Sequence, residues 1–173
     1  MKLRNLNYVM NLANGHHSDR EGLTVLEVAR ANVELMDHLM EGLRVSYALL
    51  YLQSTLHCDL FHEGKNSFSD VGETYGYTGS TVRVENGTLS CRFYERRPLP
   101  TGTLQRRSIP MKSGRYVRSS FKRSAAHDYE RELALMTEEQ YAIMRATGKN
   151  IKTAIRKIRE SELMKTYGKH LNK

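Results

Sequence analysis

His57, Cys58, Asp59 and His62 carry side chains of the kinds that bind metal ions. On a helix, Cys58 and His62 share a face, as do Asp59 and His62, because residues three or four apart are neighbours there. A structural zinc site, however, usually takes four ligands, with a second Cys or His pair at its own short spacing. The sequence lacks that second pair. We therefore interpret the cluster as a polar helix end and predict no metal or other cofactor.

Four carboxylates, Glu27, Glu34, Asp37 and Glu41, fall on one side of a predicted helix. A paired-carboxylate nuclease site would use such groups, but a solvated helix face explains them more simply. No Ser or Cys nucleophile carries a family signature, and the glycines of residues 64–80 lack the order of a phosphate-binding loop. We predict no catalytic residue and no enzyme.

Basic charge offers a stronger signal. Residues 92–123 hold ten Lys or Arg and one acid, Glu95, a net charge of +9 in a chain of +8. Together with a pI near 9.6, this predicts a polyanionic partner, nucleic acid first and an acidic membrane surface or acidic protein second. Arginine outnumbers lysine eight to two in the segment, and its fork of donors suits phosphate oxygens.

The predicted nucleic-acid-binding residues are the ten basic side chains of this segment and three aromatic ones between them. The basic side chains are expected to contact phosphates, and the aromatic rings to support or probe bases. The full set is Arg92, Phe93, Tyr94, Arg96, Arg97, Arg106, Arg107, Lys112, Arg115, Tyr116, Arg118, Lys122 and Arg123.

A long helix is predicted to support this segment. Thr24 and Glu27 have the spacing of a capping box, which begins a helix. Apolar residues at alternating spacings of three and four then run from Leu26 to Leu50. We expect the helix to end between His57 and Glu63, before Gly64. It serves as the central helix of the domain or as a homodimer seam over residues 25–57, and both roles can hold together.

The pattern then changes to a period of two. Residues 81–85 and 88–96 flank Asn86-Gly87, the strongest short hairpin signal, because a type I′ turn needs positive φ at both central positions. Leu89, Cys91 and Phe93 are predicted to lie on one face of the hairpin with Val82 and Val84. The opposite face carries Arg83, Arg92, Tyr94 and Arg96.

Residues 103–109 and 115–118 are predicted to add a third and a fourth strand. Residues 127–136 are predicted as a helix, and Thr137 with Gln140 as the capping box of another. The predicted fold is α+β: a long N-terminal helix packed on a small antiparallel β-meander, followed by C-terminal helices. We expect a single domain over residues 1–173, helical in 1–63, a meander in 81–118 and helical in 124–168.

The remaining signals concern location. The N-terminus lacks the apolar run of a signal peptide, and no segment approaches the length of a membrane span. Two cysteines, Cys58 and Cys91, do not make a secreted disulfide framework. We expect a cytoplasmic protein that does not act at a membrane.

The order of features resembles the MobI-type conjugative-transfer proteins of integrative elements and plasmids. The resemblance rests on LSCRFYERR (Leu89–Arg97), IPMKSGRYVRSSFKR (Ile109–Arg123) and the helical stretch of residues 128–159. It covers roughly the last two thirds of the chain. One departure is the absence of Trp from the basic strand, where Phe93-Tyr94 stands instead.

That resemblance implies an accessory factor that binds transfer-origin DNA, in duplex form, and supports recruitment of a relaxase or another transfer protein. It implies no catalytic residue. Two alternatives stay open from the residues alone: a non-enzymatic adaptor whose basic arm docks an acidic protein, and an RNA-binding module.

Overall fold

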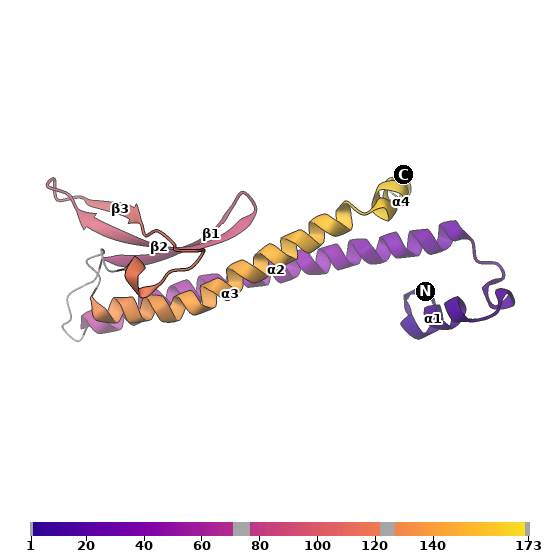
Figure 1. Cartoon of the computed structure of the whole chain (residues 1–173), viewed down its shortest axis with the longest axis horizontal. Coiled ribbons are helices and arrows are strands. Elements are labelled where there is room, and N and C mark those ends of the chain that lie inside the picture. The colour runs from indigo at the N-terminus through magenta and orange to yellow at the C-terminus, as the bar shows by residue number, and fades with distance from the viewer. Residues whose placement is uncertain (1, 71–76, 122–126, 172–173) are drawn as a thin grey trace. The chain divides into compact units, whose positions relative to one another are not determined.

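The computed structural model describes residues 2–70, 77–121 and 127–171. In chain order the elements are η1 (Lys2–Arg4), α1 (Leu6–Asn14), η2 (His17–Arg20), α2 (Val25–Asp70), β1 (Thr78–Glu85), β2 (Thr88–Pro98), β3 (Leu104–Ser108), η3 (Arg118–Ser120), α3 (Asp128–Arg159) and α4 (Glu162–Leu171) (Figure 1). The predicted α+β fold, with a long N-terminal helix, an antiparallel meander and C-terminal helices, is confirmed.

Two compact units can be distinguished. One comprises Met1–Ser46 with Ile151–Lys173, and the other Tyr47–Asn150. The single domain expected over residues 1–173 stays a prediction. No helix among the described ranges is both long enough and apolar enough to cross a membrane.

The sheet in the second unit is a three-stranded meander in the order β1-β2-β3, antiparallel throughout. Its first turn is the predicted Asn86-Gly87 pair, with φ of 50° and 67°. These positive values are what a type I′ turn requires. The Tyr47 hydroxyl of α2 donates a hydrogen bond of 3.0 Å to the Gly87 carbonyl oxygen, so the helix holds the hairpin tip.

One face of the sheet packs on helices of the same unit, and we call it the inner face (Figure 1). Leu89, Cys91 and Phe93 on β2 are buried there, on one face of the strand as predicted from the alternation. The Phe93 ring lies 5.6 Å, centroid to centroid, from both Phe61 of α2 and Tyr141 of α3. The core of this unit therefore forms where β2 crosses the two helices.

Helix α2 does not end before Gly64, as predicted, but continues to Asp70. A side chain at Gly64 would bring its Cβ to 3.2 Å from the Leu133 side chain of α3. The glycine therefore permits close helix packing and does not act as a helix stop. The capping box that starts the helix is confirmed, since Thr24 N donates to Glu27 and Glu27 N donates to the Thr24 hydroxyl.

Helix α3 is one continuous helix, so the predicted break at Thr137 is wrong. The Thr137 hydroxyl donates to the Leu133 carbonyl oxygen one turn earlier, at 2.8 Å, as a hydroxyl inside a helix can. Gly148 also stays within the helix, and its bare backbone faces Tyr47, Leu50 and Leu89.

The predicted fourth strand is also wrong. Residues 112–115 make a single isolated bridge, and η3 follows. The reason is a buried carboxylate on α3: Tyr116 N donates to Glu138 at 3.1 Å, where a strand would donate to its neighbour. Arg145 forks onto the same Glu138 and also donates to the carbonyl oxygens of Cys91 and Gly114.

A second buried ion pair holds β1 to the helices. Lys65 of α2 and Glu130 of α3 lie 3.2 Å apart, with side chains 5% and 0% exposed. Lys65 also donates to the Thr78 carbonyl oxygen, and Thr78 N donates to Glu130 at 3.1 Å. Because a buried charge needs both a counter-charge and hydrogen bonds, each group here depends on the other.

In the first unit, the apolar seam of α2 is used within the chain. Ala29, Val33 and Met40 are buried, and the Ser161 hydroxyl lies 4.0 Å from the Met36 sulfur. Helix α1 begins at Leu6, after the N-cap Asn5, whose side chain accepts from Tyr8 N, and it ends at Asn14.

Candidate nucleic-acid interface

The face of the sheet opposite the core, which we call the outer face, carries an array of arginines. Strand alternation and register place Arg83 on β1, Arg92 and Arg96 on β2, and Arg106 on β3 on this side. All four are exposed. Their backbones belong to a hydrogen-bonded sheet, so the spacing of the cations is fixed by the strands.

Tyr94 organises one end of this array. Its ring lies across Gly79 of β1, where an added Cβ would come within 2.2 Å of the ring carbon Cζ. The Arg106 guanidinium stacks on the Tyr94 ring at 3.6 Å from its centroid, and Arg96 lies near the same ring at 5.9 Å. Cation–π contact of this kind orients a guanidinium without neutralising it. Tyr94 is itself only 6% exposed, so it acts as a platform for arginine.

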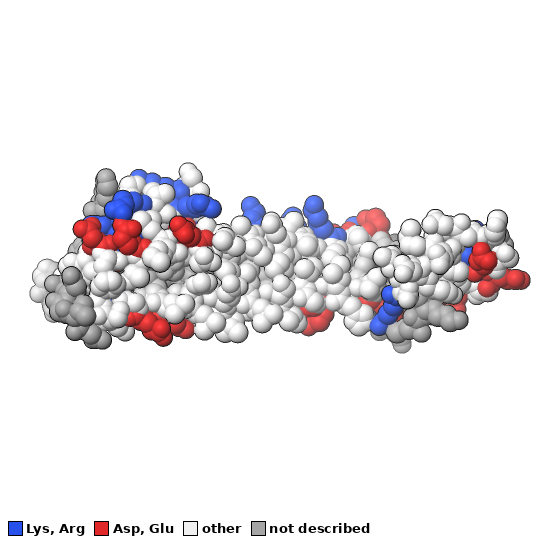
Figure 2. Space-filling model, turned by 90° about the horizontal axis from the view of Figure 1, so that it is seen from below, with Lys and Arg blue, Asp and Glu red and all other residues white. Residues whose placement is uncertain are grey.

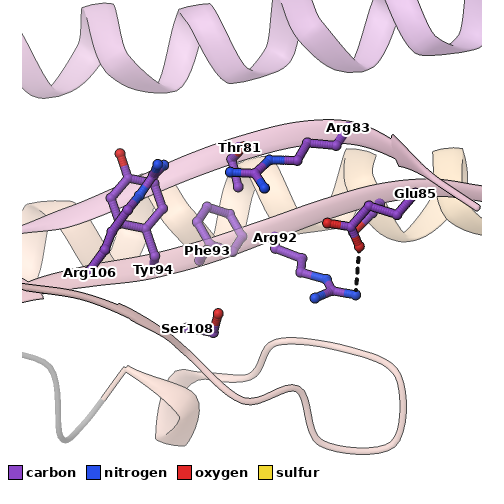
Figure 3. Close-up of a pocket in the computed structure, with 9 residues that line it drawn as sticks. Thr81, Arg83, Glu85, Arg92, Phe93, Tyr94, Arg106 and Ser108 are labelled. Carbon is purple, nitrogen blue, oxygen red and sulfur yellow. Dashed lines mark ion pairs between the residues drawn. The ribbon is translucent and has the colours of Figure 1, made fainter.

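A shallow hollow of about 230 Å³ opens on the outer face (Figure 3). Arg83 extends along β1 toward Thr81, and Arg92 approaches Glu85 to form an ion pair of 3.1 Å. Glu85 is the one acid that lines this hollow. Arg83 and Arg106 also line it, and neither forms an ion pair among the described residues.

Figure 2 shows where charge gathers on one side of the molecule. Lys and Arg side chains cluster over the part of the chain that contains the sheet, and acidic side chains lie beside them.

The structure brings four of the predicted site residues together on the outer face, namely Arg92, Tyr94, Arg96 and Arg106. Three others, Arg97, Arg107 and Lys112, line a separate pocket on the opposite side of β3. Arg115 is exposed, and Arg118 forms an ion pair with Glu132. Lys122 and Arg123 lie outside the described residues.

Phe93 and Tyr116 occupy the core, 0% and 3% exposed. The Tyr116 hydroxyl accepts a hydrogen bond of 3.3 Å from Phe93 N, and the two rings meet edge to face. Burial raises the pKa of Tyr116. Neither ring has a face open to a base, because both pack in the core beneath the strand that carries Arg92 and Arg96.

Arg83 lies outside the predicted set, although its side chain lines the outer hollow. The signal that finds it is the hairpin register. Alternation from the Asn86-Gly87 turn pairs Arg83 with Ser90 and places it beside Arg92, whereas charge density along the chain selects only residues from Arg92 onward.

Cys58 and His62, two of the residues with metal-binding side chains, have structural roles in the fold. Cys58 is buried in the core, and the His62 ring lies 3.2 Å from the Ser80 carbonyl oxygen, with its pKa lowered mainly by burial. Within residues 2–70, 77–121 and 127–171, no group of three or more His, Cys, Asp or Glu side chains is arranged to hold a metal ion.

Helix α2 also leaves an apolar stripe exposed in the second unit. It consists of Leu49, Leu52, Leu56 and Leu60, spaced by three or four residues and each 54–60% exposed. The neighbouring Tyr47 and Leu50 instead pack against the core. A stripe of this spacing is typical of a helix that meets another helix.

A comparison with protein families gives one match, to the family model described as MobI protein, over residues 61–159. The matched segment contains the whole sheet and α3. No curated protein and no solved structure matches the chain. MobI proteins are accessory proteins of mobilisation and conjugation and are not known enzymes. Because the match spans more than half of the chain, this protein belongs to the MobI family.

Proposed function

We propose that this protein is the DNA-binding accessory factor of a conjugative element, and that it engages duplex DNA at the transfer origin through the outer face of its sheet. The observation that carries the proposal is the array of Arg83, Arg92, Arg96 and Arg106 on three rigid strands, with one acid in the hollow between them. Strands and β-ribbons bind duplex DNA in its grooves, and arginines bind its phosphates.

Geometry favours DNA phosphates over a less regular acidic partner. Arginine guanidinium groups held at fixed positions on strands match a ligand whose charges repeat regularly, as the phosphates of a duplex do. Tyr94 adds to this match because it orients Arg106 before any ligand arrives. Arg92 already has Glu85 as a partner, so we expect it to contribute less than Arg83, Arg96 and Arg106.

The test is the salt dependence of binding to a short duplex from the transfer origin, measured by fluorescence anisotropy. Each phosphate neutralised contributes about −0.9 to the slope of log affinity against log salt. Replacing Arg83, Arg96 and Arg106 by Gln should therefore flatten the slope by about 2 to 3.

The matched control removes three exposed arginines elsewhere, Arg20, Arg30 and Arg44, and should leave the slope unchanged. If the slope of log affinity against log salt flattened equally in both variants, the effect would come from net charge alone, and the outer face would not be the DNA-binding surface. Tighter binding of RNA than of duplex DNA would favour the RNA-binding alternative. No binding to any nucleic acid at low salt would favour an acidic protein partner.

The proposal includes a homodimer formed through α2. It is supported by the exposed stripe of Leu49, Leu52, Leu56 and Leu60, which presents the same spacing to a second copy of itself. In this proposal the predicted seam packs within the chain and the neighbouring stripe forms the interface. Replacing Leu52 and Leu56 by Glu should convert a dimer to a monomer in light scattering, whereas Met136→Glu on α3, which is also exposed, should not. A monomeric wild-type protein at micromolar concentration would contradict it.

We also propose that the bound protein helps to recruit a relaxase, which the mobilisation role of the family supports. The expected result is that the relaxase is retained on transfer-origin DNA at higher salt in the presence of the protein. The outer-face variant should lose that effect together with DNA binding.

A further inference from the structure

A second hollow, the inner pocket, opens on the other side of β3 from the outer face and has a volume of about 650 Å³. Three cations line it, Arg97, Arg107 and Lys112, with one carboxylate, Glu95. Arg106 and Arg107 are consecutive on β3, so alternation turns one to the outer face and the other to the inner pocket. The two hollows are therefore separate sites that share an edge strand.

The single carboxylate is already neutralised. Glu95 forms an ion pair of 2.8 Å with Nε of Arg97, and its side chain is only 8% exposed. Lys112 donates to the Ser119 hydroxyl, which carries no charge. Arg107 has no acidic partner among the described residues. Two positive charges thus remain in the pocket without a counter-charge.

Two charges of this sign match a phosphate monoester, which carries about −1.5 to −2 at neutral pH. A phosphodiester within a strand carries one charge and would leave a cation unmatched. The hydroxyl of Ser119 lies in the same lining and can contact phosphate oxygens. The charge balance therefore favours the phosphorylated end of a nucleic-acid strand over a phosphodiester in its interior.

The rest of the lining suits a nucleoside. Ile109, which is buried, and Pro110 form an apolar wall beside the cations. The pocket is almost three times the volume of the outer hollow, which leaves room for a sugar and a base in addition to a phosphate. Apolar walls with a few placed polar groups are the usual lining of such sites.

We propose that the inner pocket binds the terminal phosphorylated nucleotide of a nucleic-acid strand, with its phosphate on Arg107 and Lys112 and its base against Ile109 and Pro110. The choice of a nucleic-acid strand as the molecule that supplies this nucleotide rests on the proposed function. A strand that lies on the outer face reaches the pocket by passing over β3, whose five residues are all exposed.

The first experiment compares a short single-stranded oligonucleotide bearing a terminal phosphate with the same oligonucleotide ending in hydroxyl groups. The full-length protein should bind the phosphorylated form at least tenfold more tightly in anisotropy. Replacing Arg107 and Lys112 by Gln should abolish that preference. Replacing Arg20 and Arg30 by Gln, which removes the same charge elsewhere, should leave it intact. Equal binding of both oligonucleotides by the wild type would overturn the proposal.

The second experiment separates this site from the outer face. Titration with thymidine 5′-monophosphate should shift the NMR signals of residues 107–112, and thymidine should not. If these shifts occur while duplex DNA fails to bind, the proposed function fails and the pocket stands. If inorganic phosphate bound as tightly as the nucleotide, the proposed contact between the base and the apolar wall would be wrong. If a phosphoserine peptide bound more tightly than the nucleotide, the ligand would not be a nucleic-acid strand.

Discussion

The helices beneath the sheet and the outer face of the sheet use the same kinds of side chain for opposite purposes. Beneath the sheet, the Lys65 side chain is 5% exposed and that of Arg145 16% exposed. Each lies against a carboxylate of α3 and also bonds a backbone carbonyl oxygen. On the outer face, Arg83 and Arg106 are exposed and form no ion pair among the described residues. A cation whose charge and donors are satisfied inside the protein holds the fold together, whereas a positioned cation without a carboxylate can bind an external anion.

That difference implies that charge density along the chain identifies the right segment but not the right residues. Arg118 belongs to the basic segment and is paired with Glu132. Arg83 precedes the segment and lines the outer hollow. The two arginines differ in whether folding brings a carboxylate within ion-pair distance of the guanidinium group.

The largest expected effect is beneath the sheet. Glu130→Gln removes the carboxylate that lies 3.2 Å from the buried Lys65 ammonium, so we expect a loss of about 3–5 kcal/mol in the free energy of unfolding. Urea denaturation followed by circular dichroism measures it. Combining Glu130→Gln with Lys65→Met should recover much of the loss. Glu41→Gln, which breaks the exposed pair with Arg44, should change stability little; a similar loss in both would erase the contrast.

Next in size is a pH effect at Cys91. Burial raises the pKa of this thiol from 9.0 to about 11. The neutral thiol is thus favoured in the folded state, and its contribution is fully present below pH 9 and lost as pH rises toward 11. Stability should fall by on the order of 2 kcal/mol across that window. Between pH 8 and pH 10.5, the free energy of unfolding of Cys91→Ala, measured by denaturation, should fall less than that of the wild type. An equal fall in both proteins would show that other titrating groups cause it.

The outer face is tested by Gly79→Ala. The added methyl group would collide with the Tyr94 ring, so the ring must move and Arg106 loses its platform. We expect a loss of about 1–3 kcal/mol in stability and several-fold weaker DNA binding. Gly42→Ala on α2, where nothing lies within 4 Å, should instead stabilise the protein by roughly 0.5–1 kcal/mol. Unchanged DNA binding in Gly79→Ala would show that Tyr94 does not position Arg106.

Much of the fold follows from local sequence. The Asn86-Gly87 turn fixes the hairpin register, and that register separates the buried Cys91 from the exposed Arg92. The Thr24–Glu27 capping box fixes where α2 begins. These features depend on residues within a few positions of one another, so the sequence contains all the information they need.

Other features depend on contacts between distant residues. Gly64 is a helix stop by its own preference, and only the approach of Leu133 explains why α2 continues. The loop around Tyr116 has the pattern of a strand, but Glu138 takes its backbone donor. The candidate site could not be predicted fully for the same reason. Phe93 and Tyr116 are buried because helices pack against them, and the alternation along a strand does not show which side chains a helix will cover.

The hydrogen bond between Tyr47 and Gly87 has a practical consequence for anyone who wishes to label this protein. The β1–β2 turn is tethered to α2, so a tag inserted there would detach the hairpin tip from its support. The β2–β3 turn offers the better position. Thr101 and Gly102 are exposed, and the turn is closed by local hydrogen bonds within residues 99–103. A fluorophore at that turn would report binding from beside the arginines while leaving the sheet anchored.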